Sequence, residues 1–182
     1  MVLGFWFEPV TYGSTRFGAE VTAEELKTIE TVARAEVRRA FSGLRVTLSD
    51  KSDARYRVRV IQHLADPRFR SDVAVAGASR VISRFGGDGA VNFSMLAAYA
   101  ASYAPAAADR TTILTAIGRG IARAAVHEFA HQLLGDAAID RTADKQTYEY
   151  GSAARREQYY GELRWGGAWP ALHKRLGGGP PR

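Results

Sequence analysis

The pentapeptide at residues 127–131, with the sequence H-E-F-A-H, constrains this chain more than any other feature. It lies in the second half of residues 111–134, whose pattern predicts one long helix that ends before Gly135. On a helix, side chains four residues apart lie one turn above each other on the same face. His127 and His131 can therefore reach one metal ion, with the Glu128 carboxylate angled toward the open side of that ion.

These residue types in this order are typical of a site where a zinc ion activates water. Hydrolytic zinc sites use neutral imidazole ligands and keep a fourth position for water, whose pKa the metal lowers toward neutrality. We therefore expect Zn²⁺ as the cofactor, with His127 and His131 as ligands. Glu128 is predicted to be the catalytic general base, which takes the proton of the water and passes it to the leaving amine.

A catalytic zinc site needs a third protein ligand, and in this chain it must be a carboxylate. Of the remaining histidines, His63 lies in or beside a predicted strand and His173 lies near the C-terminus. The carboxylates that follow the motif are, in order of preference, Asp140, Glu149 and Asp144. Asp140 comes first because Gly135 lets the chain fold back, so that a short loop can reach the metal. A candidate that is not a ligand is expected to be a solvated loop carboxylate, a helix cap or a partner of a zinc histidine.

The composition excludes several classes of protein. At 182 residues, the chain is long enough for one domain with a hydrophobic core. It has no uninterrupted apolar run that could span a bilayer, so we do not expect an integral membrane protein. No signal peptide is visible, which leaves a cytoplasmic protein and a trimmed secreted protein as alternatives. The absence of cysteine excludes disulfides and thiolate metal ligands.

The net charge of +6 comes mainly from arginines that are scattered along the chain. Scattered charge is typical of solvated surfaces, whereas the charges that bind nucleic acid cluster on one face. Arg55, Arg57 and Arg59 are close together, but they alternate with apolar residues as in a strand with one wet face. The charge pattern therefore argues against a nucleic-acid partner, and the motif predicts a peptide or protein substrate.

The predicted elements follow the order strand, helix, several strands and then the motif helix. Thr22 and Glu25 form a capping box that starts a helix, which ends near Ser42-Gly43. Residues 86–89, G-G-D-G, are predicted to form a turn between two extended segments. The predicted strands span residues 4–10, 45–48, 55–62, 73–81 and 89–93, and an alanine-rich helix spans residues 94–103 before Pro105.

This layout, together with the H-E-x-x-H pentapeptide, resembles the zincin metallopeptidases over residues 1–135. The resemblance implies an α+β fold, in which a twisted mixed sheet has a backing helix and the active-site helix beneath it. It implies one catalytic domain, residues 1–182, with a small, mostly helical C-terminal subdomain at 136–176 and a tail at 177–182. In zincins the last strand before the active-site helix borders the cleft and pairs with extended substrate. Here that strand is 89–93, either as an exposed edge that binds substrate or as a plain hairpin arm.

The chain departs from the metzincin subgroup of this family. A metzincin has a glycine three residues after the second histidine, where this chain has Leu134 and places Gly135 one residue later. Ala137 stands where the third metzincin histidine would be. The only methionines are Met1 and Met95, so no methionine turn follows the motif. The layout is therefore metzincin-like, but the third ligand must differ.

Two other zincin subgroups use a carboxylate as the third ligand. Gluzincins take a glutamate from a later helix, and Glu149 lies at nearly the corresponding distance. However, Gly151 and Ser152 are typical of a break and cap just before a helix, which would leave Glu149 outside it. Aspzincins use an aspartate soon after the motif and then a tyrosine-glycine pair, which loosely resembles Asp140 and Tyr150 with Gly151.

Tyrosines and tryptophans are concentrated in residues 148–169. Most should belong to the core, with Ser152 capping a helix that carries Tyr159 and Tyr160 and with Trp169-Pro170 starting a last short helix. In zincins, tyrosines or basic residues donate to the oxyanion of the tetrahedral intermediate, so one residue here is expected to do the same. The candidates are Tyr148, Tyr150, Tyr159, Tyr160 and Arg155.

The sequence thus predicts a zinc-dependent metallopeptidase with His127, His131 and Asp140 as ligands and Glu128 as the base. The alternative is a zinc-binding or protein-interaction domain with a zincin fold and no peptidase activity, in which a fourth protein ligand closes the coordination. Cleavage preference, oligomeric state, cellular location and the mechanism of latency stay open at this stage.

Overall fold

The computed structural model describes residues 1–14, 17–65, 75–83, 86–135 and 139–178. Its main sheet has the strand order β4 (Thr47–Ser49), β1 (Val2–Phe7), β5 (Tyr56–Ile61), β7 (Gly86–Asn92) and β6 (Gly77–Ser83). The pairs from β4 to β7 are parallel, whereas β6 pairs antiparallel with β7 and lies at the edge of the sheet. Two short strands, β2 (Gly13–Ser14) and β3 (Gly18–Glu20), pair with each other. The predicted combination of a mixed sheet with helices is confirmed.

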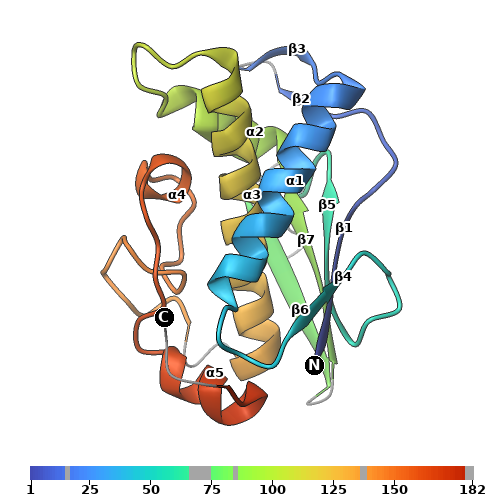
Figure 1. Ribbon diagram of the computed structural model, residues 1–182, viewed down its shortest axis with the longest axis vertical. Helices are drawn as coiled ribbons and strands as arrows, with labels where there is room; N and C mark the ends of the chain where they lie inside the picture. The colour runs from blue at the N-terminus through green and yellow to red at the C-terminus, as the bar shows by residue number, and fades with distance from the viewer. Residues whose placement is uncertain (15–16, 66–74, 84–85, 136–138, 179–182) are drawn as a thin grey trace.

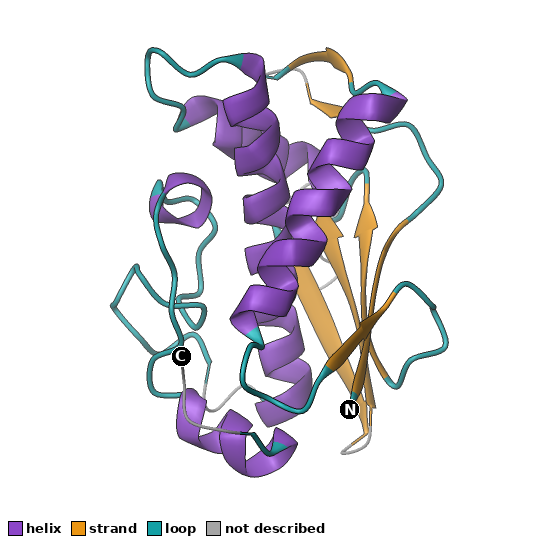
Figure 2. Cartoon of the chain, in the orientation of Figure 1, coloured by secondary structure: helices purple, strands orange, loops and turns teal. Residues whose placement is uncertain are grey.

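Two long helices lie on one face of this sheet, as Figures 1 and 2 show. α1 (Ala23–Ala40) begins at the predicted capping box, in which Thr22 and Glu25 each accept a hydrogen bond from the backbone of the other. α3 (Arg110–Leu134) packs against α1 and against strands β5, β6 and β7, and α2 (Phe93–Ser102) directly follows β7. Among the described residues, no helix is both long and apolar enough to cross a lipid bilayer.

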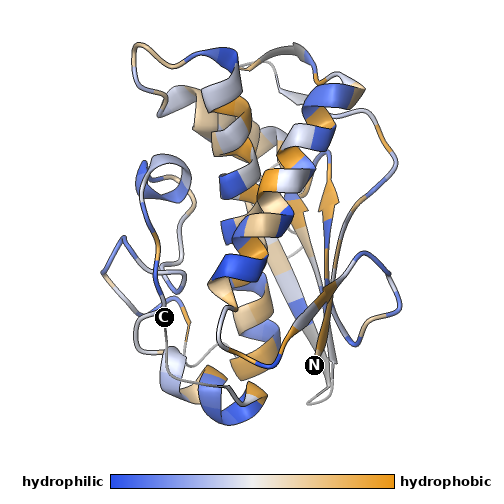
Figure 3. Cartoon of the chain, in the orientation of Figure 1, coloured by the Kyte–Doolittle hydropathy of each residue, from blue (hydrophilic) through white to orange (hydrophobic). Residues whose placement is uncertain are grey.

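Strand β5 shows how the sheet separates the core from solvent. Tyr56, Val58 and Val60 are buried among the helices, whereas Arg57 and Arg59 are partly exposed on the opposite face. This confirms the alternation that the sequence predicts for the strand. Figure 3 shows a similar division on α1, where hydrophobic and hydrophilic residues alternate around the helix. The arginines of β5 thus belong to a solvated sheet face, where Arg57 pairs with Asp88 at 2.9 Å.

The glycine-rich segment at residues 86–89 is part of strand β7 and not a turn, so that prediction is wrong. The glycines serve the close packing of α3 on the sheet instead of a reversal of the chain. A Cβ atom on Gly87 would lie 2.4 Å from Cγ of Gln132 on α3, which is too close for any other residue. The Gln132 side chain accepts from the Arg57 N–H at 3.1 Å and donates to the Arg57 carbonyl at 2.9 Å. These glycines therefore allow a polar side chain to tie the motif helix to the sheet.

The strand expected to bind substrate, residues 89–93, is not at an edge. Most of it lies in β7, between β5 and β6, and Phe93 begins α2. The edge strand next to β7 is β6, because the chain reverses after β6 and places β7 between β6 and β5. The sequence pattern alone could not show this, since both segments have the composition of extended structure.

The C-terminal part, residues 139–178, consists mostly of loops that run along α3 (Figure 1). Its helices are the short α4 (Glu157–Tyr160) and α5 (Trp169–Leu176), so the prediction of a mostly helical subdomain is wrong. Short polar side chains favour turns here by bonding to nearby backbone N–H groups. Ser152 is one of them: its hydroxyl accepts from the backbone two residues on, ahead of α4, and it does not cap a helix. The Pro170 position in the first turn of α5 agrees with the prediction.

Candidate metal centre

His127 and His131 lie one turn apart on α3, with side chains that are 15 % and 13 % exposed. Their Nε2 atoms are 3.1 Å apart. The Asp140 carboxylate faces both rings, with Oδ1 at 3.1 Å from Nε2 of His127 and Oδ2 at 3.3 Å from Nε2 of His131. One ligand atom from each of the three residues lies within 4.8 Å of the others. These three residues could therefore hold a single metal ion.

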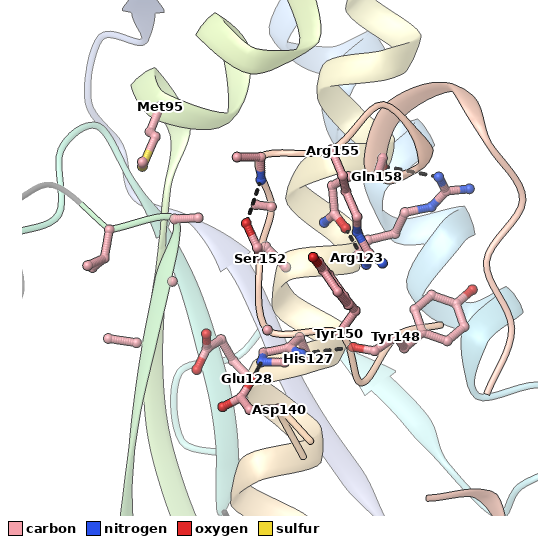
Figure 4. Close-up of a pocket in the computed structure, with 18 of the residues that line it drawn as sticks. Met95, Arg123, His127, Glu128, Asp140, Tyr148, Tyr150, Ser152, Arg155 and Gln158 are labelled. Carbon is pink, nitrogen blue, oxygen red and sulfur yellow. Dashed lines mark hydrogen bonds and ion pairs between the residues drawn. The ribbon is translucent and has the colours of Figure 1, made fainter. Parts of the chain in front are cut away.

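The His127 ring is oriented by the backbone of the C-terminal part. Its Nδ1 atom lies 2.8 Å from the carbonyl oxygen of Tyr148, which Figure 4 marks with a dashed line. Because a carbonyl oxygen can only accept, Nδ1 carries a proton, and in the neutral ring Nε2 then keeps its lone pair for a metal. A hydrogen bond of this kind fixes the tautomer and the ring orientation of a metal-binding histidine.

Asp140 is brought to the histidines by an unusual backbone. The helix ends at Gly135, whose φ of 78° lets the chain turn, and Asp140 has itself a positive φ of 66°. The Asp140 N–H donates to the Glu149 carbonyl at 3.0 Å, which holds the residue in place. A Cβ atom on Gly151 would lie 2.6 Å from Oδ1 of Asp140, so any other residue there would displace the carboxylate from its present position. The contact of its carboxylate with the His127 ring is the main reason why the pKa of Asp140 lies below its ordinary value.

Glu128 lies next to this group and is 6 % exposed. Its carboxylate packs against edge strand β6, where a Cβ atom on Gly77 would lie 2.5 Å from Oε1. Burial raises the pKa of Glu128, and the nearby His127 and His131 oppose this by favouring the charged carboxylate. A carboxyl group with a raised pKa beside a metal-binding group is suited to take up and release a proton.

The other two carboxylates that the sequence nominates have structural partners elsewhere. Glu149 is buried and accepts from the backbone N–H groups of Gly166 at 2.8 Å and Ala168 at 2.9 Å. Asp144 accepts from a backbone N–H in its own turn and pairs with Arg164 at 3.0 Å. The structure thus brings Asp140 to the histidines and assigns Glu149 and Asp144 to the loops.

A pocket of about 510 Å³ opens over the two histidines. One wall is α3, and the opposite wall is residues 76–79, most of which belong to β6. Met95 and Tyr99 of α2 also line the pocket, as do residues 150–155. Figure 4 shows Glu128 and Asp140 at the base of this pocket, with Tyr150 beside His127. The pocket gives a ligand access to the His–His–Asp group.

Among the predicted oxyanion donors, Tyr150 lies nearest to the two histidines. It is partly buried and lines the pocket, and in Figure 4 its ring starts beside His127 while its hydroxyl points away from His127 and Asp140. The Tyr148 hydroxyl points away from the pocket. Tyr159 is fully buried, and the Tyr160 hydroxyl donates to a carbonyl of α2 at 2.8 Å. Arg155 lines the pocket, but its terminal nitrogens are bonded to protein groups.

Three features of the centre were not predicted from the sequence. The Tyr148 carbonyl is a backbone group, so no residue type marks it. Gly77 has the same appearance as any glycine near a strand, although it makes room for Glu128. Gly151 belongs to the tyrosine-glycine pair, which was the one available signal for its position beside Asp140.

Comparisons with protein-family models, with curated proteins and with solved structures found no match.

Proposed function

We propose that this chain is a zinc-dependent metallopeptidase of zincin type, in which His127, His131 and Asp140 hold Zn²⁺. The observation that carries the proposal is the convergence of three ligand atoms within 4.8 Å beside the buried Glu128. Two imidazoles and one carboxylate are a donor set that zinc favours, and His127 has the oriented tautomer that a zinc ligand needs. Among the described residues, the group includes no fourth His or acidic ligand, which favours a catalytic site with an open position over a closed structural site.

Bound zinc would lower the pKa of a coordinated water and polarise the scissile carbonyl of a peptide. Glu128 would act as the general base, accepting a proton from water and passing it to the leaving amine. The burial of Glu128 suits this role, because it raises the pKa of the carboxyl group. A general base whose pKa lies closer to the working pH can both accept and release a proton. Tyr150 is the proposed donor to the oxyanion, since it lines the pocket and a rotation of its side chain would bring the hydroxyl toward a substrate bound there.

The proposed substrate is an extended peptide that pairs with edge strand β6. Residues 77–79 of this strand line the pocket, and the Ser79 hydroxyl donates to the Glu128 backbone carbonyl at 3.2 Å. An unpaired strand edge offers backbone groups to a peptide in regular spacing. In this proposal β6 takes the substrate-binding role that was predicted for residues 89–93, most of which lie inside the sheet.

Substitution of Glu128 by glutamine separates metal binding from catalysis. Glu128→Gln should bind one zinc per chain, as the wild type does, and should hydrolyse a quenched fluorescent peptide library at least about a hundredfold more slowly. The matched control is Glu162→Gln, which changes an exposed glutamate far from the pocket and should leave turnover unchanged. Normal turnover of Glu128→Gln would contradict the proposed role of this residue.

The alternative, a zinc-binding or protein-interaction domain without peptidase activity, predicts a different result in the same experiment. The wild type would bind zinc, yet no peptide in the library would be cleaved by it. A fourth protein ligand in the zinc X-ray absorption spectrum would support that alternative, because closed coordination is typical of structural zinc.

A further inference from the structure

Arg155 is a charged side chain that is almost completely buried in a loop, with 4 % of its surface exposed. One terminal nitrogen donates to the carbonyl of Lys145, and the other donates to the carbonyl of Thr147 at 3.0 Å. The second nitrogen also donates to Oε1 of Gln158 at 3.0 Å. Its Nε is buried without a hydrogen-bond partner among the described residues. Burial of a guanidinium with an unsatisfied N–H lowers the stability of the fold. The hydrogen bonds of its terminal nitrogens must therefore offset that cost or serve the nearby site.

The two carbonyls that Arg155 holds belong to the segment that orients the metal centre. Thr147 directly precedes Tyr148, whose carbonyl accepts from Nδ1 of His127 at 2.8 Å. On its other side the segment is held by Arg164, because the Tyr148 N–H donates to the Arg164 carbonyl at 3.1 Å. Arg155 and this backbone bond therefore fix both polar groups of the peptide unit that joins Thr147 to Tyr148, which directly precedes the unit that carries the Tyr148 carbonyl.

Arg155 is itself fixed to the motif helix. Its partner Gln158 donates through Nε2 to the Gly120 carbonyl on α3 at 3.2 Å. Arg123, one turn before His127, donates to the carbonyls of Glu157 and Gln158. The α3 helix thus holds α4, α4 holds Arg155, and Arg155 holds the peptide units that lead to His127. Arg155 also lies over the Tyr150 ring, 4.8 Å from its centre.

We propose that Arg155 is a positioning residue for the zinc site: by holding the Lys145 and Thr147 carbonyls, it directs the Tyr148 carbonyl to His127 and so raises metal affinity. This inference rests on the proposed zinc binding. We assign Arg155 to positioning and not to donation to the substrate, because its Nε is buried and both terminal nitrogens donate to protein groups. The planar fork of a guanidinium reaches two carbonyls at once, which a lysine ammonium on a flexible stem cannot do with the same geometry.

Zinc affinity of purified variants, measured by competition with a chromophoric chelator, tests this proposal. Arg155→Lys should bind zinc about 10-fold more weakly than the wild type, the lower end of the range for loss of an outer partner of a metal ligand, because Arg155 acts on His127 only through the Tyr148 carbonyl. Gln158→Met leaves Arg155 in place but releases it from α3, and it should weaken zinc binding by a smaller factor. The visible spectrum of the cobalt-substituted Arg155→Lys protein should also change, since it reports on the coordination geometry.

Two controls separate positioning from general stability. Ile29→Ala removes part of a fully buried side chain of α1 and destabilises the protein without touching the C-terminal loops. Arg164→Met removes a side chain that is 63 % exposed and binds Asp144 in the same segment. Both controls should keep zinc affinity within about threefold of the wild type and leave the cobalt spectrum unchanged.

The outcomes distinguish this inference from the proposed function. A wild type that binds no zinc would overturn both. A wild type that binds zinc, together with Arg155→Lys and Gln158→Met variants of equal affinity, would overturn only the role of Arg155. The same conclusion would follow if Ile29→Ala lowered zinc affinity as much as Arg155→Lys does. If Arg155→Lys does not fold, an unchanged affinity of Gln158→Met is sufficient to reject the proposal.

Discussion

Replacement of Arg123 by methionine should lower the free energy of unfolding by about 4 kcal/mol, because it removes one partner of a buried ion pair. The Arg123 side chain is 1 % exposed, and its Nε donates to Oε1 of Glu36 at 2.6 Å. It also donates to the carbonyls of Glu157, Gln158 and Gly161 at 2.9, 3.1 and 3.0 Å.

The magnitude follows from what the substitution leaves behind. Breaking a buried pair by removing one partner costs about 3–5 kcal/mol. Arg39 still pairs with Glu36 at 2.7 Å after the change, which reduces the cost, and methionine fills much of the volume. The three carbonyls that Arg123 contacts lose a charged hydrogen-bond donor, which increases the cost. These opposing effects place the expected loss near the middle of the range.

Urea denaturation of the metal-free protein, followed by circular dichroism, measures this loss. The control Arg164→Met removes an exposed ion pair with Asp144 and should cost about 1 kcal/mol or less. A double-mutant cycle with Glu36→Gln should give a coupling energy of about 1.5 kcal/mol or more, as expected for a charged hydrogen bond. A loss below about 1 kcal/mol for Arg123→Met, equal to that of the control, would refute the argument from burial.

Three further predictions concern pH, packing and the metal. Burial opposes ionisation of Glu36, but Arg39 and Arg123 hold its pKa below the ordinary value of 4.5. The ionised carboxylate therefore contributes stability above pH 4.5, and this contribution is lost as the pH falls below that value. The free energy of unfolding of Glu36→Gln should decline less in acid than that of the wild type, and an equal decline would contradict the assignment. A Cβ atom on Gly120 would lie 2.3 Å from the Tyr159 ring, so Gly120→Ala should cost about 1–3 kcal/mol in urea denaturation, whereas Gly167→Ala, with no atom within 4 Å, should cost less. Zinc in excess, at about 100 times its dissociation constant, should stabilise the wild type by about 2.7 kcal/mol and leave Asp140→Ala much less affected; equal stabilisation of the two would exclude Asp140 as a ligand.

The sequence by itself determined the elements whose signals are local. The capping box of Thr22 and Glu25 starts α1, and the alternation around Arg57 marks β5 as a strand with one wet face. The spacing of His127 and His131 places both imidazoles on one face of α3, because four residues make about one helical turn. These features depend on neighbours within a few residues, so they can be read from the chain without knowledge of the fold.

Only the tertiary structure decided how the elements meet. The glycines of residues 86–89 have the composition of a turn, but they form part of β7, which pairs with β5 and β6, and Gln132 of α3 packs against Gly87 and Gly89. The order of β6 and β7 in the sheet, and with it the edge that borders the pocket, depends on pairing between distant segments.

The same is true of the candidate metal centre. The sequence ranked Asp140 ahead of Glu149, but the contact with the histidines depends on the positive φ angles of Gly135 and Asp140 and on the space beside Gly151. The Tyr148 carbonyl could not be predicted at all, since every residue has such a group and its direction is set by distant hydrogen bonds. Local spacing determined the two histidines of this group, whereas long-range packing decided which carboxylate and which carbonyl join them.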